Sequence, residues 1–91
     1  MNIDTDLLLQ AIQKWGKEAQ IDKIQEEAQE LALALHQVKC LTKENEEGMS
    51  KIYGELADMQ IVMEYVPLLF NQNKIDRIKQ MKLNILKQLL Q

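Results

Sequence analysis

Apolar residues recur every three or four positions through most of this chain, which is the spacing that places side chains on one face of an α-helix. The pattern predicts four helices, over residues 4–15, 18–40, 49–65 and 74–90. Few glycines or prolines interrupt them, and 46% of the residues are hydrophobic, so enough apolar surface is available for helix packing. We therefore expect an all-α fold, a bundle of about four helices in one domain over residues 1–91.

Breaks in the pattern separate the predicted helices. Gly16 ends or bends the first helix, and the polar segment 41–48 is a loop of ordinary length for a helical hairpin. Pro67 kinks or ends the third helix, which in a longer alternative continues to residue 70. Asparagine and glutamine at 71–73 form a turn with good capping residues before the last helix.

The two central helices carry one pattern twice. The stripe of the second helix consists of Ile21, Ile24, Ala28, Leu31, Leu35 and Val38. The stripe of the third consists of Ile52, Leu56, Met59, Met63 and Val66. A shift of 28 positions carries the stripe of the second helix from Ile24 onward onto that of the third. The two helices are therefore expected to pack in the same way.

Each of these helices also carries two carboxylates one turn apart, Glu27 with Glu30 and Glu55 with Asp58, and the same shift relates the pairs. Both pairs are expected to flank the apolar core. In an antiparallel hairpin, residues at the same level have numbers with a constant sum, and Glu27 with Asp58 and Glu30 with Glu55 both give 85. One hairpin can therefore bring all four carboxylates to one height, where they can hold a hard divalent cation.

Length and charge limit the classes of protein that fit. A chain of 91 residues is only marginally stable alone. Outside the main stripe of the second helix lies Leu33, with Ala32 and Ala34 beside it. These apolar residues indicate that the second helix is covered on more than one side. We therefore expect a homodimer. The net charge of −3 argues against binding to a nucleic acid polymer. No apolar run reaches a membrane span and no signal peptide is recognisable, so a cytoplasmic protein is expected.

Three features have two interpretations each. Trp15 is either a core or interface residue or a platform on which a base stacks. The last helix is basic, and its charge is either a solvated face or a means for Lys79 and Lys82 to meet a bound polyphosphate. Lys23 shares the face of Glu27 and Glu30, so its ammonium can pair with them or reach a phosphate.

One segment reads Glu26-Glu27-Ala-Gln-Glu30, and after 24 intervening residues a second reads Glu55-Leu-Ala-Asp58. The two segments resemble the EExxE and ExxD motifs of the MazG-like all-α nucleoside triphosphate pyrophosphohydrolases. The resemblance covers nearly the whole chain. It implies a helical bundle completed by dimerisation, as a dimer or a dimer of dimers. It also implies hydrolysis of an NTP or dNTP to the NMP and pyrophosphate.

By motif position, the resemblance gives roles to individual residues. The expected Mg²⁺ ligands, with Mn²⁺ as an alternative metal, are Glu27, Glu30, Glu55 and Asp58. Glu26 is the candidate to orient or deprotonate the attacking water, although its angle on the helix points away from the cluster. The expected substrate-binding residues are Lys23, Lys79, Lys82 and Trp15. The rival hypothesis is a non-catalytic helical module for dimerisation or protein interaction.

Overall fold

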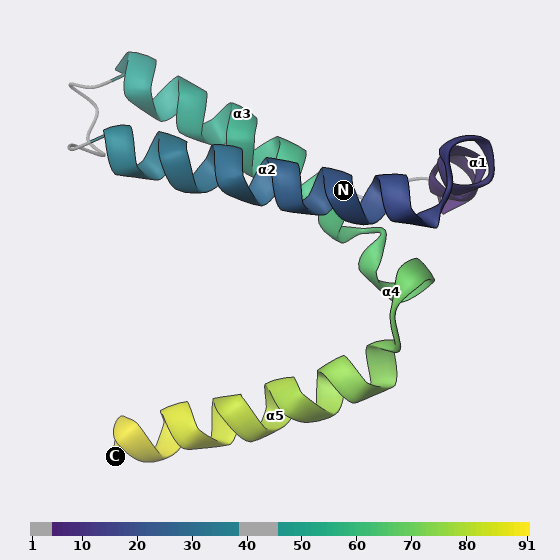
Figure 1. The fold of residues 1–91 in the computed structure, drawn as a ribbon. Helices are drawn as coiled ribbons and strands as arrows, with labels where there is room; N and C mark the ends of the chain where they lie inside the picture. Colours follow the sequence, from purple (N-terminus) through teal and green to yellow (C-terminus); the bar gives the residue numbers. More distant parts are fainter. Residues whose placement is uncertain (1–4, 39–45) are drawn as a thin grey trace.

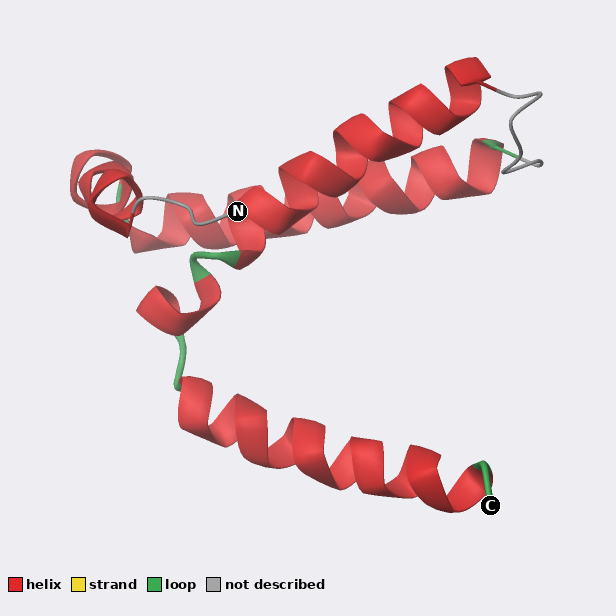
Figure 2. Ribbon diagram, turned by 180° about the vertical axis from the view of Figure 1, so that it is seen from behind, coloured by secondary structure: helices red, strands yellow, loops and turns green. Residues whose placement is uncertain are grey.

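All regular structure in the computed structural model, which describes residues 5–38 and 46–91, is helical (Figures 1 and 2). The helices are α1 Thr5–Trp15, α2 Lys17–Gln37, α3 Glu46–Met63, α4 Val66–Leu69 and α5 Gln72–Leu89. The expectation of an all-α chain with about four long helices is therefore confirmed for the described residues. Within them, none of the helices has both the length and the apolar character that crossing a membrane requires.

The breaks between helices lie close to where the sequence predicts them. Gly16 has a φ of 94°, a left-handed conformation that suits glycine, and it separates α1 from α2. The predicted loop 41–48 is shorter than expected, because Glu46, Glu47 and Gly48 already belong to α3. At its other end α2 stops at Gln37, short of residue 40, and the remainder of the loop lies outside the described residues.

Pro67 does separate two helices, and the longer alternative for the third helix is wrong. The third helix, α3, ends at Met63, and Pro67 sits in the first turn of α4, where a missing backbone N–H breaks no helical hydrogen bond. The last helix then begins after Asn71, whose side chain accepts a hydrogen bond of 3.1 Å from the backbone N–H of Lys74.

The second and third helices lie side by side and antiparallel, as predicted, but they meet along a face rotated from the predicted stripe (Figure 1). The buried and half-buried positions of α2 and its C-cap are Gln20, Ile21, Ile24, Glu27, Leu31, Ala34 and Val38. Those of α3 are Gly48, Met49, Ile52, Glu55, Met59 and Val62. Apart from Ile21 and Met49, these positions alternate steps of four and three residues. We call this heptad face the seam of the hairpin.

Two residues of each predicted stripe lie outside the seam, and this part of the prediction is wrong. Ala28, Leu35, Leu56 and Met63 are exposed, while Glu27 lies in the seam rather than beside it. The physical reason is that two helices alone bury only a narrow strip of each other, whereas the apolar arc of each helix is wider than that strip. The remainder of the arc stays on the outside of the hairpin.

The outside of the hairpin has two chemically different sides. At 100° per residue, the exposed residues of the two stripes lie on one side of the hairpin, and the residues beside them carry no charge. This side, here called the uncharged face, consists of Gln25, Ala28, Ala32, Leu35, Tyr53, Leu56, Gln60 and Met63, all exposed. The opposite side, here called the charged face, carries Lys23, Glu26, Glu30, Lys51 and Asp58. Charge is thus segregated across the hairpin.

The main apolar core lies at the end of the hairpin where α1 and α4 join it. Leu8 of α1, Val62 of α3, Tyr65 at the N-cap of α4 and Leu69 of α4 are buried together there. This cluster fixes α1 and α4 on the hairpin, but it is small for a chain of this length.

The last helix stands apart from the rest. In both ribbon views α5 turns back after α4 toward the loop end of the hairpin but diverges from it, and from Asp76 to its end every residue is exposed (Figures 1 and 2). The radius of gyration is 16.3 Å, against about 12 Å for a compact domain of this length. A single chain therefore does not close the predicted bundle, and its completion by a second chain stays a prediction.

Replacing Leu69 by alanine tests this core. The buried leucine joins α4 to α1 and α3, so Leu69→Ala should lower the free energy of unfolding by about 2–4 kcal/mol. Leu90→Ala, at a side chain that is 79% exposed, should change it by less than about 0.5 kcal/mol. Urea unfolding of both variants at one protein concentration checks this, and equal losses would contradict the location of the core.

Candidate metal centre

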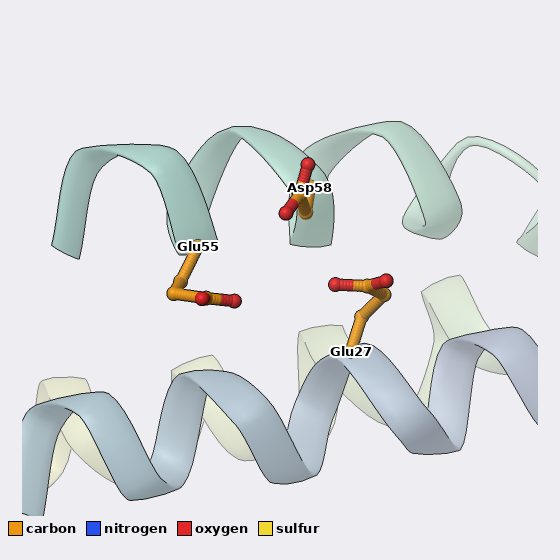
Figure 3. Close-up of side chains that lie close together, drawn as sticks. All are labelled: Glu27, Glu55 and Asp58. Carbon is orange, nitrogen blue, oxygen red and sulfur yellow. The ribbon is translucent and has the colours of Figure 1, made fainter. Parts of the chain in front are cut away.

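Three carboxylates meet between α2 and α3. Glu27 reaches up from α2, Glu55 reaches down from α3, and Asp58 lies one turn further along α3 (Figure 3). One oxygen from each lies within 4.8 Å of the others. The hairpin register predicted from the sequence is therefore confirmed for these three residues.

Two of these carboxylates have an oxygen without a partner. Glu27 is only 6% exposed, and both its Oε2 and the Oε2 of Glu55 are buried without a hydrogen bond among the described residues. A buried charged oxygen that lacks a partner costs at least about 1–3 kcal/mol, so the arrangement is unfavourable in the protein alone. A cation between the two oxygens would remove this cost.

Two lysines offset part of the negative charge. Lys23 Nζ lies 3.2 Å from Glu27 Oε1 and 3.9 Å from Glu26, and Lys51 Nζ lies 4.0 Å from Glu55. The hydrogen bond to Glu27 and the charge of Glu26 raise the pKa of Lys23 above its usual value. Sequence reasoning missed Lys51, although the 28-residue shift that relates the carboxylates also relates Lys23 to Lys51.

The fourth predicted ligand, Glu30, is not part of the group of three. It is exposed and lies beside the group, where it lines an open groove of about 290 Å³ together with Leu33, Lys51 and Glu55. The charge of Glu27 raises the pKa of Glu30, with smaller contributions from burial and from Glu55. The charges of the cluster therefore act on Glu30, but Glu30 does not belong to the group of three carboxylates.

The three carboxylates fit a hard divalent cation. Oxygen donors with negative charge are the ligands that Mg²⁺ and Mn²⁺ prefer. Two oxygens bound to one Mg²⁺ lie at most about 4.2 Å apart, twice its usual ligand distance, so small side-chain rotations would bring the group into range. The unpartnered oxygens of Glu27 and Glu55 are the ones a cation would satisfy.

A second hollow, of about 360 Å³, adjoins the cluster at Lys23. Trp15, Ile61 and Tyr65 supply much of its wall, and Lys23 separates it from Glu27. Trp15 is 63% exposed, with the ammonium of Lys14 5.3 Å from its ring centroid. The interpretation of Trp15 as a core residue is therefore wrong, whereas an interface residue and a stacking platform both remain consistent with its exposure.

Three other predicted site residues lie away from the cluster. The side chain of Glu26 is 59% exposed and pairs with Lys23, and Glu26 does not belong to the group of three carboxylates. Lys79 and Lys82 are exposed on α5, which stands apart from its own hairpin. Within one chain, the structure does not bring either lysine to the carboxylates.

Comparison with known proteins identified no relative of the chain. No protein-family profile matches the chain, and searches of curated proteins and of solved structures found no significant match.

Replacing Glu55 by glutamine tests the metal centre through stability. The amide would remove a buried charge and could donate to Glu27 Oε2, so the metal-free variant should be more stable by about 1 kcal/mol. Wild type should gain about 2.7 kcal/mol when free Mg²⁺ is a hundredfold above its dissociation constant, and the variant much less. Thermal and urea unfolding with and without Mg²⁺ measure both effects. Glu47→Gln, an exposed carboxylate of the same helix, should keep the full Mg²⁺ gain.

The raised pKa of Glu30 predicts a pH effect in metal-free protein. A native pKa above the unfolded one means that ionised Glu30 destabilises the fold, so this destabilisation disappears as pH falls through the native pKa. Glu30→Gln should therefore be more stable than wild type near neutral pH, and the difference should shrink at acidic pH. Unfolding of both proteins in a chelator, from about pH 7.5 to about pH 4, measures it. A difference independent of pH would show that Glu30 does not interact with the cluster.

Proposed function

We propose that the protein is a Mg²⁺-dependent nucleoside triphosphate pyrophosphohydrolase, a cytoplasmic enzyme that converts an NTP or dNTP to the NMP and pyrophosphate. The observation that supports it best is the pair of buried, unpartnered oxygens of Glu27 and Glu55, which face each other beside Asp58. The motif resemblance to the MazG-like enzymes, EExxE at Glu26–Glu30 and ExxD at Glu55–Asp58, supports the same proposal.

In this proposal Glu27, Glu55 and Asp58 hold the metal, and Glu30 joins them from the edge of the groove. Bound Mg²⁺ would supply charge neutralisation at the phosphates and a lower pKa for a water molecule. In this reaction water would add to the α-phosphorus and release a proton to the solvent, the bond from that phosphorus to the bridging oxygen would break, and pyrophosphate would leave with the bonding electrons. The protein itself contributes position and charge more than covalent chemistry.

The residues around the cluster can position a nucleotide. Lys23 already lies against Glu27 and separates the cluster from the hollow at Trp15, so it is placed to contact a phosphate. The hollow, lined by Trp15, Ile61 and Tyr65, is large enough for the base and presents an exposed aromatic ring. Glu26, paired with Lys23, is the candidate to orient water from the exposed side.

A second candidate function is a non-catalytic helical module that dimerises or binds a protein. The uncharged face supports it, because exposed side chains such as Leu35, Leu56 and Met63 form an uncharged surface on a hairpin that is otherwise rich in charge. An interaction module needs neither the metal nor its carboxylates. Metal binding and pyrophosphate release therefore discriminate between the two functions.

Activity assays of carboxylate variants test the proposed enzyme. Wild-type protein should release pyrophosphate from at least one NTP or dNTP when Mg²⁺ or Mn²⁺ is present, and not in a chelator. Glu27→Gln and Asp58→Asn should each lower kcat by at least about 100-fold, because a mispositioned metal forfeits several kcal/mol of transition-state stabilisation. A screen of the common NTPs and dNTPs for pyrophosphate gives both results.

The matched control is Asp22→Asn, which removes an exposed carboxylate from α2 on the side away from the cluster. It should keep wild-type kcat, and circular dichroism should show equal helicity in all three variants. Full activity in Glu27→Gln and Asp58→Asn, or no pyrophosphate from any nucleotide, would refute the enzyme and leave the interaction module.

A further inference from the structure

The seam of α2 holds two polar residues, and the proposed enzyme uses only one of them. Glu27 belongs to the carboxylate cluster, whereas Gln20 lies two turns earlier on the same face and is 6% exposed. Burial of an amide without hydrogen-bond partners is unfavourable, and an apolar side chain would pack better in a heptad seam. Helix packing alone therefore does not account for Gln20.

The amide of Gln20 has no partner in the protein, yet it is not sealed off. It makes no hydrogen bond among the residues that the structure describes. The fully enclosed side-chain atoms without a partner in that part of the chain are oxygens of Glu27 and Glu55, so the amide atoms of Gln20 are not completely covered. Gln20 lines the hollow of about 360 Å³ at Lys23, and a ligand in this hollow would reach the amide.

The remaining wall of this hollow suits a flat aromatic ring. Ala19, Ile61 and Val62 make part of the wall apolar. Trp15, which is 63% exposed, presents an indole ring on which any base can stack, because every base has a π-face. A polar group in a largely apolar pocket fixes the orientation of a ligand, and the amide of Gln20 is such a group.

Gln20 also lies at a suitable distance from the candidate metal centre. At 100° and 1.5 Å per residue, Gln20, Lys23 and Glu27 lie within about 60° of one another round α2, with Gln20 about 10 Å from Glu27 along the axis. Lys23 lies between them, and its Nζ is 3.2 Å from Glu27 Oε1. A sugar and its 5′-phosphate can bridge this separation. A base in the hollow therefore leaves the phosphates near Lys23 and the carboxylates.

We propose that Gln20 binds the edge of the base, an inference that rests on the nucleotide substrate of the proposed function. Its carboxamide carries an N–H donor next to a C=O acceptor, so a base edge with a neighbouring acceptor and donor forms two hydrogen bonds with it. Stacking on Trp15 holds the ring, and the amide of Gln20 distinguishes a base with such an edge from a ring without one. The stability lost by burying the amide is recovered when the base binds.

Titration with nucleoside monophosphates tests this inference without metal or hydrolysis. Trp15 is the only tryptophan of the chain, so its indole N–H gives a single signal in the NMR spectrum of ¹⁵N-labelled protein. In a chelator, at least one of AMP, GMP, CMP and UMP should shift this signal in a saturable way. Gln20→Leu should weaken the tightest of these complexes by at least about fivefold, the lower end of what a bidentate base contact contributes.

The matched control separates base binding from packing. Gln25→Leu makes the same replacement at an exposed position on the uncharged face of α2, and it should keep every affinity within about twofold. Gln20→Leu should raise the melting temperature, because it removes a buried amide without a partner, so its loss of binding would not come from unfolding.

Replacing Gln20 by glutamate tests the chemistry of the contact. Gln20→Glu exchanges the donor for a second acceptor. Guanine is the common base with two neighbouring donors on one edge, N1–H and N2–H, so the affinity for GMP relative to AMP should rise by at least about fivefold. The added negative charge acts on both nucleotides alike, and the ratio of the two affinities is therefore the quantity to compare with wild type.

The results also distinguish this inference from the proposed hydrolysis. Equal affinities in Gln20→Leu and Gln25→Leu, or an unchanged ratio of GMP to AMP binding in Gln20→Glu, would overturn the base contact. Absence of a saturable shift with all four monophosphates would overturn it too. Pyrophosphate release is measured separately with Mg²⁺. Binding that depends on Gln20, in a protein that releases no pyrophosphate, would refute the hydrolysis and support the base contact.

Discussion

The structure depends on the burial of carboxylates in the seam between α2 and α3. Glu27 and Glu55 occupy heptad positions that an ordinary hairpin would fill with apolar side chains, and each keeps an oxygen without a partner. Apolar contacts at the two ends of the seam, by Ala34 and Ile52 near the loop and by Val62 near α1, hold the helices together around them. The close carboxylates make the middle of the hairpin electrostatically unfavourable, unlike the apolar centre of an ordinary helical hairpin.

This constraint also explains why a single chain looks incomplete. A seam that contains charged residues at its centre buries less apolar surface than a regular hairpin, and the rest of the apolar arc faces outward at residues such as Leu35 and Leu56. The radius of gyration of 16.3 Å and the exposure of α5 are consistent with this small buried apolar surface. A protein of this size with charged residues at central packing positions buries little apolar surface within one chain.

The sequence predicted the helices, the hairpin register and all three clustered carboxylates, with Glu30 as a fourth that the structure leaves outside the group, because periodicity and a constant sum of positions are local and geometric properties. It did not predict the rotation of the helices, since their apolar arc is wider than the seam and hydrophobicity alone does not choose the half that faces inward. For that reason Glu27 was expected beside the core and Ala28 within it, whereas the structure shows the reverse. The exposure of α5 could not be predicted either, because its apolar residues are spaced as in a packed helix.

The 28-residue repeat gives the site an approximate two-fold symmetry, and its departures from symmetry matter for function. Lys23 and Glu27 on α2 correspond to Lys51 and Glu55 on α3, so the charges around the centre are balanced. The symmetry breaks at the third position, where Asp58 joins the group and the longer Glu30 stays at its edge. It breaks again outside the centre, because the hollow with Trp15 adjoins Lys23 while the groove beside Glu55 is lined by Lys51. The carboxylates and lysines at the centre are thus matched on the two helices, whereas the surfaces on either side of them differ.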